Sequence, residues 1–275
     1  MTATLIALLL AAPAPACSPI EVRAARFAPG ELLRYRLDVL GTDVGTFEVS
    51  LDTPQGTDRG KAALLARSRA KTNAFVTTNL GRYEGFITTL LRPDLMPIRF
   101  REELDEGDRH RAVEVEFPSK GGKLAARSSV DGKPEPLELD ASPHARELIS
   151  AFLYLRALPL KAGTPVCLEV YAARKMWSMT GAVGPREAVD IPLGKFNAVR
   201  IDLLAVRRDD ESVKRSAHAW ITDDDRRLPV VAIGEVRGKT FRAQLVEAPA
   251  AHLKTSAAKP DRKTGSQRVG TSIGR

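Results

Sequence analysis

The 275-residue sequence predicts an all-β, mainly antiparallel fold, a single barrel-like or sandwich-like domain with one covering helix near residues 142–156. Strand-like alternation, tight polar turns and one segment of helical spacing lead to this prediction. Apolar and charged residues alternate over residues 33–39 and again over 47–51, with a turn at 41–43 between them. A period of two puts neighbouring side chains on opposite faces, so these segments should form a hairpin with one face in water.

Further strands are expected along the chain, separated by short connections rich in Gly, Pro and Asp. They are residues 98–102, 112–117, 123–130, 134–139, 166–172, 196–206, 216–221, 228–236 and 240–246. Asp131-Gly132 is the clearest turn, because this dipeptide readily adopts the positive φ angles of a type I′ hairpin. Such short connections join antiparallel strands, since parallel strands need a long crossover.

One segment, residues 142–156, has the spacing of a helix. Ser142 can cap its first turn, and Pro143 suits the first helical position, where no backbone donor is required. The apolar residues that follow fall toward one side. They are Leu148, Ile149, Phe152, Leu153 and Leu155. We expect this helix to plug or cover the sheet with that side.

The N-terminal residues indicate export. Residues 5–16 are apolar or small, too few to span a bilayer and typical of a signal peptide. The expected organisation is a signal peptide at 1–16, a linker at 17–26, one β domain at 27–247 and a basic disordered tail at 248–275. Cys17 is the candidate lipidation residue, which would tether the protein to a membrane on its periplasmic side. Cleavage without lipidation would leave a periplasmic protein, in which Cys17 could pair with Cys167; otherwise Cys167 should be a buried apolar residue.

The net charge of +8 does not indicate a nucleic-acid partner. Residues 248–275 contain six basic residues against one aspartate, so most of the excess lies in the tail. Aromatic residues make up only 5% of the chain and are not interleaved with basic ones, as single-strand binding would require. We therefore expect no nucleic acid among the partners.

Four short segments, taken in order, resemble the bacterial exported proteins of the DUF3108 family. They are residues 27–31 (FAPGE), 150–156 (SAFLYLR), 192–198 (PLGKFNA) and 220–224 (WITDD), the last followed by RLP at 227–229. The resemblance covers most of residues 27–246. It implies a β-barrel-like or sandwich-like protein of the cell envelope, and it implies no reaction.

No motif for catalysis, metal binding or phosphate binding is present, so we predict no catalytic residue, no metal ligand and no cofactor. Six residues are instead candidates for a ligand pocket or its rim: Tyr154, Arg156, His218, Trp220, Asp223 and Asp224. Each has a structural alternative. Arg156 could pair with an aspartate, His218 could be a packed or rim residue, and Asp223-Asp224 could cap a solvated turn.

These observations favour a non-enzymatic envelope protein that binds an apolar or amphipathic ligand, such as a lipid or an envelope glycan. One alternative is a structural or partner-binding module with a filled core. Another is a hydrolase of envelope polymer, for which the sequence provides no catalytic set.

Overall fold

The computed structural model describes residues 19–22, 27–58, 60, 62–236 and 238–249. Fifteen strands of this part of the chain form one sheet. Their order is β11-β12-β13-β14-β15-β16-β17-β1-β2-β3-β4-β5-β6-β8-β9, and all neighbours are antiparallel except β11 and β12. A mostly antiparallel, barrel-like sheet is therefore confirmed, and it is not closed by hydrogen bonds between its end strands.

The elements of the first half are β1 (Leu32–Val39), β2 (Thr42–Asp52), the 3-10 helix η2 (Gly56–Asp58), β3 (Leu64–Thr72), α1 (Ala74–Leu80), β4 (Tyr83–Leu91), β5 (Pro97–Glu106), β6 (Arg109–Glu116), β7 (Gly122–Lys123), β8 (Ala125–Val130) and β9 (Lys133–Pro134). Those of the second half are β10 (Asp140–Ala141), β11 (Ala145–Glu147), α2 (Leu148–Ala157), β12 (Pro165–Ala172), β13 (Lys175–Ile191), β14 (Gly194–Arg207), β15 (Asp210–Thr222), β16 (Pro229–Val236) and β17 (Lys239–Glu247). The short strands β7 and β10 pair separately.

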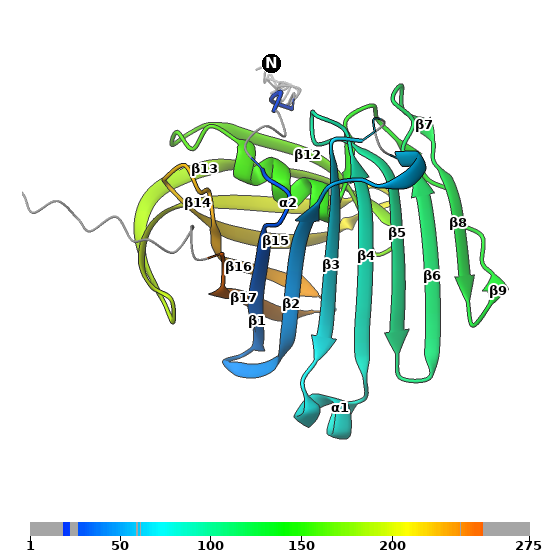
Figure 1. The fold of residues 1–275 in the computed structure, drawn as a ribbon, viewed down its shortest axis with the longest axis horizontal. Coiled ribbons are helices and arrows are strands. Elements are labelled where there is room, and N and C mark those ends of the chain that lie inside the picture. Colours follow the sequence, from blue (N-terminus) through cyan, green and yellow to red (C-terminus); the bar gives the residue numbers. More distant parts are fainter. Residues whose placement is uncertain (1–18, 23–26, 59, 61, 237, 250–275) are drawn as a thin grey trace, which may run out of the picture.

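The sheet bends so that its two halves cross with α2 between them (Figure 1). The accumulated twist of many antiparallel strands produces this curvature. We call the face of each half that is turned toward α2 the inner face, and the opposite face the outer face. One core joins α2 to inner-face residues of β2, β3 and β4 on one side and of β12, β13, β14 and β15 on the other. The helix therefore fills the interior of the curved sheet.

The predicted helix is placed correctly in the fold, but its start was wrong. Residues 142–147 are not helical, because Ala145–Glu147 forms strand β11 and pairs with Glu169–Tyr171 of β12. The helix begins at Leu148, and Glu147 is its N-cap: the carboxylate accepts hydrogen bonds from the backbone N–H groups of Ile149 and Ser150 at 2.7 and 2.6 Å. Ser142 instead closes a turn, in which its hydroxyl accepts from the backbone N–H of His144 at 3.2 Å and its carbonyl accepts from that of Ala145 at 3.1 Å.

The helix is also buried on more sides than the sequence indicated. Ile149, Leu153 and Tyr154 are almost fully buried, and Ser150 and Arg156 are as well, whereas Leu148 is exposed. A helix with polar residues in its buried surface lies inside the fold rather than on it.

The turn at Asp131-Gly132 has the predicted geometry, with φ of 49° and 75°. The sequence did not predict β3, β4, β13 or α1, and β9 is only two residues long instead of the expected 134–139. Among the described helices, none combines the length and the apolar character needed to cross a membrane.

Candidate functional site

Cross-strand pairing orders the side chains on the outer face of β3, β4, β5 and β6 into rows. The first row is Leu65, Leu90, Arg99 and Glu116; the second is Arg67, Thr88, Arg101 and Glu114; the third is Arg69, Phe86, Glu103 and Ala112. Apolar side chains thus lie in the first and third rows, surrounded by charged ones. Because this face is turned toward water, packing in the core does not explain why apolar side chains lie on it.

Two adjoining hollows lie over these apolar residues. The larger, about 600 Å³, has Leu65, Leu90, Phe86 and Thr88 among its lining residues. The smaller, about 370 Å³, also contacts Leu90 and continues toward Phe117. We call the two hollows together the outer groove. Leu65 and Leu90 are buried although they point away from the interior core.

The connection between β2 and β3 forms one wall of the outer groove. Gln55 and Asp58 contribute to its lining, and Asp58 accepts a hydrogen bond from Arg99 at 2.9 Å. This ion pair ties η2 to β5 above the buried leucines. On the other side, Arg101 donates to Glu103 at 2.8 Å. The rim therefore presents both signs of charge.

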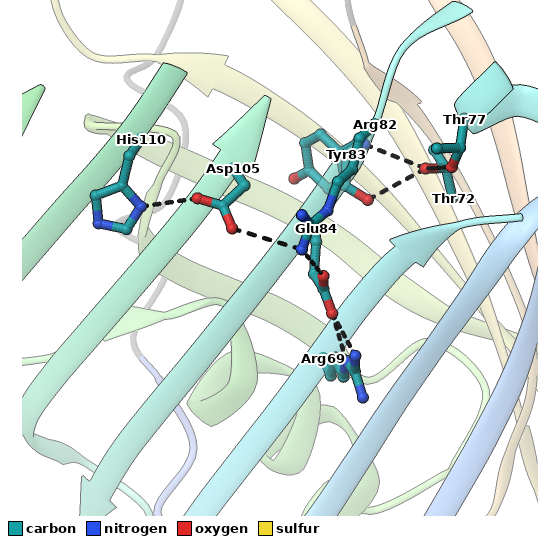
Figure 2. A network of polar contacts seen from close by, with 8 residues as sticks. All are labelled: Arg69, Thr72, Thr77, Arg82, Tyr83, Glu84, Asp105 and His110. Atoms are coloured by element: carbon teal, nitrogen blue, oxygen red, sulfur yellow. Dashed lines mark hydrogen bonds and ion pairs between the residues drawn. The ribbon is translucent and has the colours of Figure 1, made fainter. Parts of the chain in front are cut away.

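A polar network continues from the outer groove toward α1 (Figure 2). The guanidinium of Arg69 lies 5.1 Å from the ring centre of Phe86, and its Nε donates to Glu84 at 2.8 Å. Hydrogen bonds from Arg82 and Arg69 lower the pKa of Glu84. Arg82 also lies 3.9 Å from Asp105, whose carboxylate contacts His110 at 2.8 Å. The network fixes one end of the outer face and leaves the outer groove as its apolar part.

Tyr154 and Arg156 do not line this groove, since both lie in the interior on α2. The Tyr154 hydroxyl accepts a hydrogen bond from the backbone N–H of Ile20 at 2.8 Å, and the guanidinium of Arg146 stacks on its ring at 4.3 Å. Burial raises the pKa of the Tyr154 hydroxyl. Its contacts join the N-terminal segment to α2.

Arg156 forms a buried ion pair, but its partner is a glutamate rather than the expected aspartate. Two guanidinium nitrogens donate to the two oxygens of Glu31, one of them at 2.9 Å, and Nε donates to the carbonyl of Arg227 at 3.0 Å. The ring of Phe27 lies 4.7 Å from the guanidinium. The pair therefore locks α2 to the entry of β1 and to the connection between β15 and β16.

His218 and Trp220 share a face of β15, as predicted, but that face is the one that alternates with the core residue Ile221. His218 contacts Asp202 of β14 at 2.6 Å, and the indole of Trp220 donates to Glu187 of β13 at 2.8 Å. Tyr154 in the interior therefore does not share a pocket with these two residues.

Asp223 and Asp224 lie in the turn after β15. Asp223 pairs with Arg186 at 2.5 Å. Burial alone would raise the pKa of Asp224, but its hydrogen bonds with Arg226 and Thr222 lower it. Arg156 reaches this turn through carbonyl oxygens and not through either aspartate. The six candidate residues are thus divided among the interior, the outer face of β15 and one turn.

The described residues contain no group of three or more His, Cys, Asp or Glu side chains suited to a metal ion. Two histidine–carboxylate contacts exist, at His110 and His218, and in the described part of the chain neither ring is hydrogen-bonded to a hydroxyl or thiol. A nucleophile beside the base is what covalent catalysis requires. The outer groove itself combines an apolar floor with a charged rim.

The sequence analysis missed the outer groove, although a signal was present. Leu64-Leu65 and Leu90-Leu91 are consecutive apolar pairs in strands. Successive side chains of a strand point to opposite faces, so one leucine of each pair must leave the core.

Cys17 lies outside the described residues, so its lipidation stays a prediction. Cys167 is buried in β12, but it is disulfide-bonded rather than a free thiol.

Comparison with known proteins places the chain in a family. It is similar to a crystal structure of a β-barrel-like protein of the domain of unknown function DUF1849 from Brucella abortus, with a TM-score of 0.52 and 11% identity over 79% of this chain and 96% of that one. It is also similar to a Bacteroides fragilis protein with a YmcC-like fold, named as a candidate exported protein, with a TM-score of 0.35 and 7% identity over 83% and 99% of the two chains. No curated protein matches. The model of DUF3108, a protein family of unknown function, matches residues 34–245, and the chain belongs to this family.

Proposed function

We propose that the protein is an exported, non-enzymatic binding protein of the cell envelope that holds an amphipathic ligand in its outer groove. The observation that carries this proposal is the placement of buried leucines beneath a hollow on the water-facing side of the sheet. An apolar floor at such a position is what a ligand with an apolar part requires.

The size and charge of the outer groove support the same reading. Small-molecule sites typically measure roughly 300–1,000 Å³ and combine apolar walls with a few polar groups. The larger hollow, about 600 Å³, lies in this range. Its rim holds Arg99 and Arg101 as well as Asp58, Glu103 and Glu114. A rim with two basic and three acidic side chains suits a neutral or zwitterionic polar group more than a polyanion.

The filled interior favours the outer face over the mouth of the barrel as the binding surface. Leu153 and Tyr154 of α2 have no exposed surface, and they pack between the two halves of the sheet. The same observation supports the second candidate function, a partner-binding envelope module with a filled core. The two functions differ in whether the outer groove takes a small ligand.

Titration with a dansyl-labelled lysophosphatidylcholine, which is a zwitterionic amphiphile, tests the proposal. Thr88 lies in the floor of the outer groove, so Thr88→Trp should fill it and weaken binding about tenfold or more, equivalent to ~1.4 kcal/mol. Thr46→Trp is the matched control, because Thr46 lies on the outer face of β2, pairs with Lys71 and does not line the groove. Saturable emission that persists in Thr46→Trp and is lost in Thr88→Trp supports the proposal. Equal weakening in both variants, or emission that never saturates, rejects it.

A further inference from the structure

The three most exposed large apolar side chains among the described residues gather at one end of the molecule. Leu40 is 91% exposed, Phe75 65% and Leu80 80%. Leu40 follows β1 in the turn to β2, while Phe75 and Leu80 belong to α1, and both connections lie at the same end of the sheet (Figure 1). We call these three residues the apolar tip. It is distinct from the outer groove, which none of them lines.

Hydrogen bonds join the two connections that carry the apolar tip. The backbone N–H of Asn73 donates to the carbonyl of Val44 at 3.0 Å, and its side-chain amide donates to the carbonyl of Asp43 at 2.8 Å. Asn73 also caps α1, since its side chain accepts from the N–H of Val76 at 2.9 Å. Leu40 and Phe75 are thus carried on segments fixed to each other through β2.

The base of α1 is fixed as well. The hydroxyl of Thr72 contacts that of Thr77 at 2.9 Å and accepts from the backbone N–H of Tyr83 at 3.1 Å (Figure 2). Val76 is the buried residue of α1 and holds the helix to the sheet. The outward direction of Phe75 and Leu80 is therefore set by the structure of α1.

The surroundings of the apolar tip carry no excess of positive charge. Residues 73–81 contain no charged side chain. At the border, Arg82 is paired with Glu84 and lies near Asp105, and the side chain of Asp43 accepts hydrogen bonds from the backbone N–H of Gly45 and the side-chain amide of Asn73. An anionic surface would find little to attract it here. A purely apolar phase covered by neutral or zwitterionic groups matches this composition.

We propose that the apolar tip inserts into the interfacial region of a lipid bilayer. A protein partner needs a concave apolar surface complementary to three separate projections, whereas acyl chains adapt to any convex shape. Leu and Phe side chains that are fixed on a projecting end can be buried in the headgroup region, as in a monotopic membrane contact. Leu40 fits this role: its φ of 52° is a conformation that favours glycine or asparagine, so the turn itself does not call for leucine.

Flotation with vesicles of phosphatidylcholine alone tests the proposal, using the full chain produced so that Cys17 carries no lipid. The wild type should float with the vesicles, and the triple variant Leu40→Ser, Phe75→Ser, Leu80→Ser should lose about tenfold or more in partitioning, equivalent to ~1.4 kcal/mol. The matched control is Leu148→Ser, Leu204→Ser, which removes exposed leucines elsewhere and should float like the wild type. All these side chains are exposed, so the wild type and both variants should have the same thermal unfolding midpoint. Equal midpoints show that a difference in flotation does not come from unfolding.

Insertion is read independently with Phe75→Trp in bilayers containing brominated phosphatidylcholine. Its emission should be quenched, while that of Leu204→Trp should change no more than that of the wild type. Three results overturn the proposal: no flotation of the wild type, equal flotation of wild type and triple variant, or binding that appears only with phosphatidylglycerol. A wild-type dimer that the triple variant abolishes in the absence of vesicles would overturn it too, because the tip would then cover a second copy.

Discussion

The interior around α2 and the outer face of β2 to β6 both contain arginine–carboxylate pairs, but under opposite conditions. The side chains of Arg156 and Glu31 are 1% and 7% exposed, whereas those of Arg67 and Asp52 are 51% and 40% exposed. In water the attraction is screened and each partner loses little when the other is removed. In the interior, removing one partner leaves the other charge without solvent. An arginine–carboxylate pair therefore fixes the position of α2 in the interior, whereas a similar pair on the outer face contributes little to stability.

The two regions also differ in how their space is filled. In the interior, the side chains of α2 fill the space between the two halves of the sheet, so the buried residues there hold the fold together. On the outer face, charged side chains form exposed ion pairs, and the few apolar side chains lie beneath a hollow. Substitutions on the outer face can therefore change the outer groove and leave the core intact.

Arg156→Met should have the largest effect, lowering the free energy of unfolding by about 3–5 kcal/mol, because it leaves the Glu31 carboxylate buried without its guanidinium partner. Denaturation in urea followed by far-UV circular dichroism measures it. The double variant Arg156→Met, Glu31→Gln should recover part of the loss. A loss below about 1 kcal/mol would show that the interior pair behaves like a surface pair.

Glu147 should make stability depend on pH through α2. Burial raises its pKa from 4.5 to about 7, partly opposed by hydrogen bonds from the N–H groups of Ile149 and Ser150. The unfolded chain releases this proton first, so the free energy of unfolding should fall as pH rises between these two values, by ~3 kcal/mol in all, and then level off.

Glu147→Gln should remove that dependence while keeping an acceptor at the N-cap. The quantity to compare is the difference between wild type and variant in urea unfolding at several pH values, since other carboxylates titrate in both. A difference that stays constant across the range contradicts the assignment.

Asn73→Ala should cost about 1 kcal/mol, because it removes the N-cap of α1. The expected loss is smaller than in the interior, since α1 is short and exposed. Hydrogen exchange followed by mass spectrometry should show faster exchange in residues 74–80 and unchanged exchange in α2. If exchange increases equally in both helices, α1 is coupled to the core more tightly than its contacts indicate.

Arg67→Met should have the smallest effect, lowering the free energy of unfolding by between about 0 and 1 kcal/mol. This loss should become smaller still in high salt, because salt screens an exposed ion pair. It makes the same substitution as Arg156→Met on the outer face, so the two urea midpoints compare the regions directly. A loss as large as that of Arg156→Met would mean that the surface pairs act as a connected network.

Several strands escaped prediction for identifiable reasons. In β3 the inward residues Ala66, Ser68 and Ala70 are small, so the alternation with basic residues carries little hydrophobic signal. In β13 the pattern is interrupted by Gly181, Gly184 and Pro185, residues that usually argue against a central strand. The helix α1 is too short for a period to appear.

The structure separates the six site candidates for a different reason. Sequence analysis chose aromatic and charged residues near one another along the chain, such as Tyr154 with Arg156 and His218 with Trp220. The outer groove is instead formed by Leu65, Leu90 and Arg99, which cross-strand pairing brings into one row. The consecutive leucines of β3 and β4 indicate that one leucine of each pair leaves the core, but they do not indicate that cross-strand pairing brings Leu65 and Leu90 together.

The sequence by itself determined the local geometry and the fold class. The alternation in residues 33–39, the positive φ angles at Asp131-Gly132 and the helical spacing of residues 148–156 all follow from interactions within a few residues, which the sequence specifies directly. The four segments that resemble the DUF3108 family indicated the family of the protein but no reaction. Tertiary structure alone decided which face of each strand is inner, which carboxylate meets Arg156, and where a hollow is left over apolar side chains. These depend on register between strands far apart in sequence, and a shift of one residue would exchange the two faces.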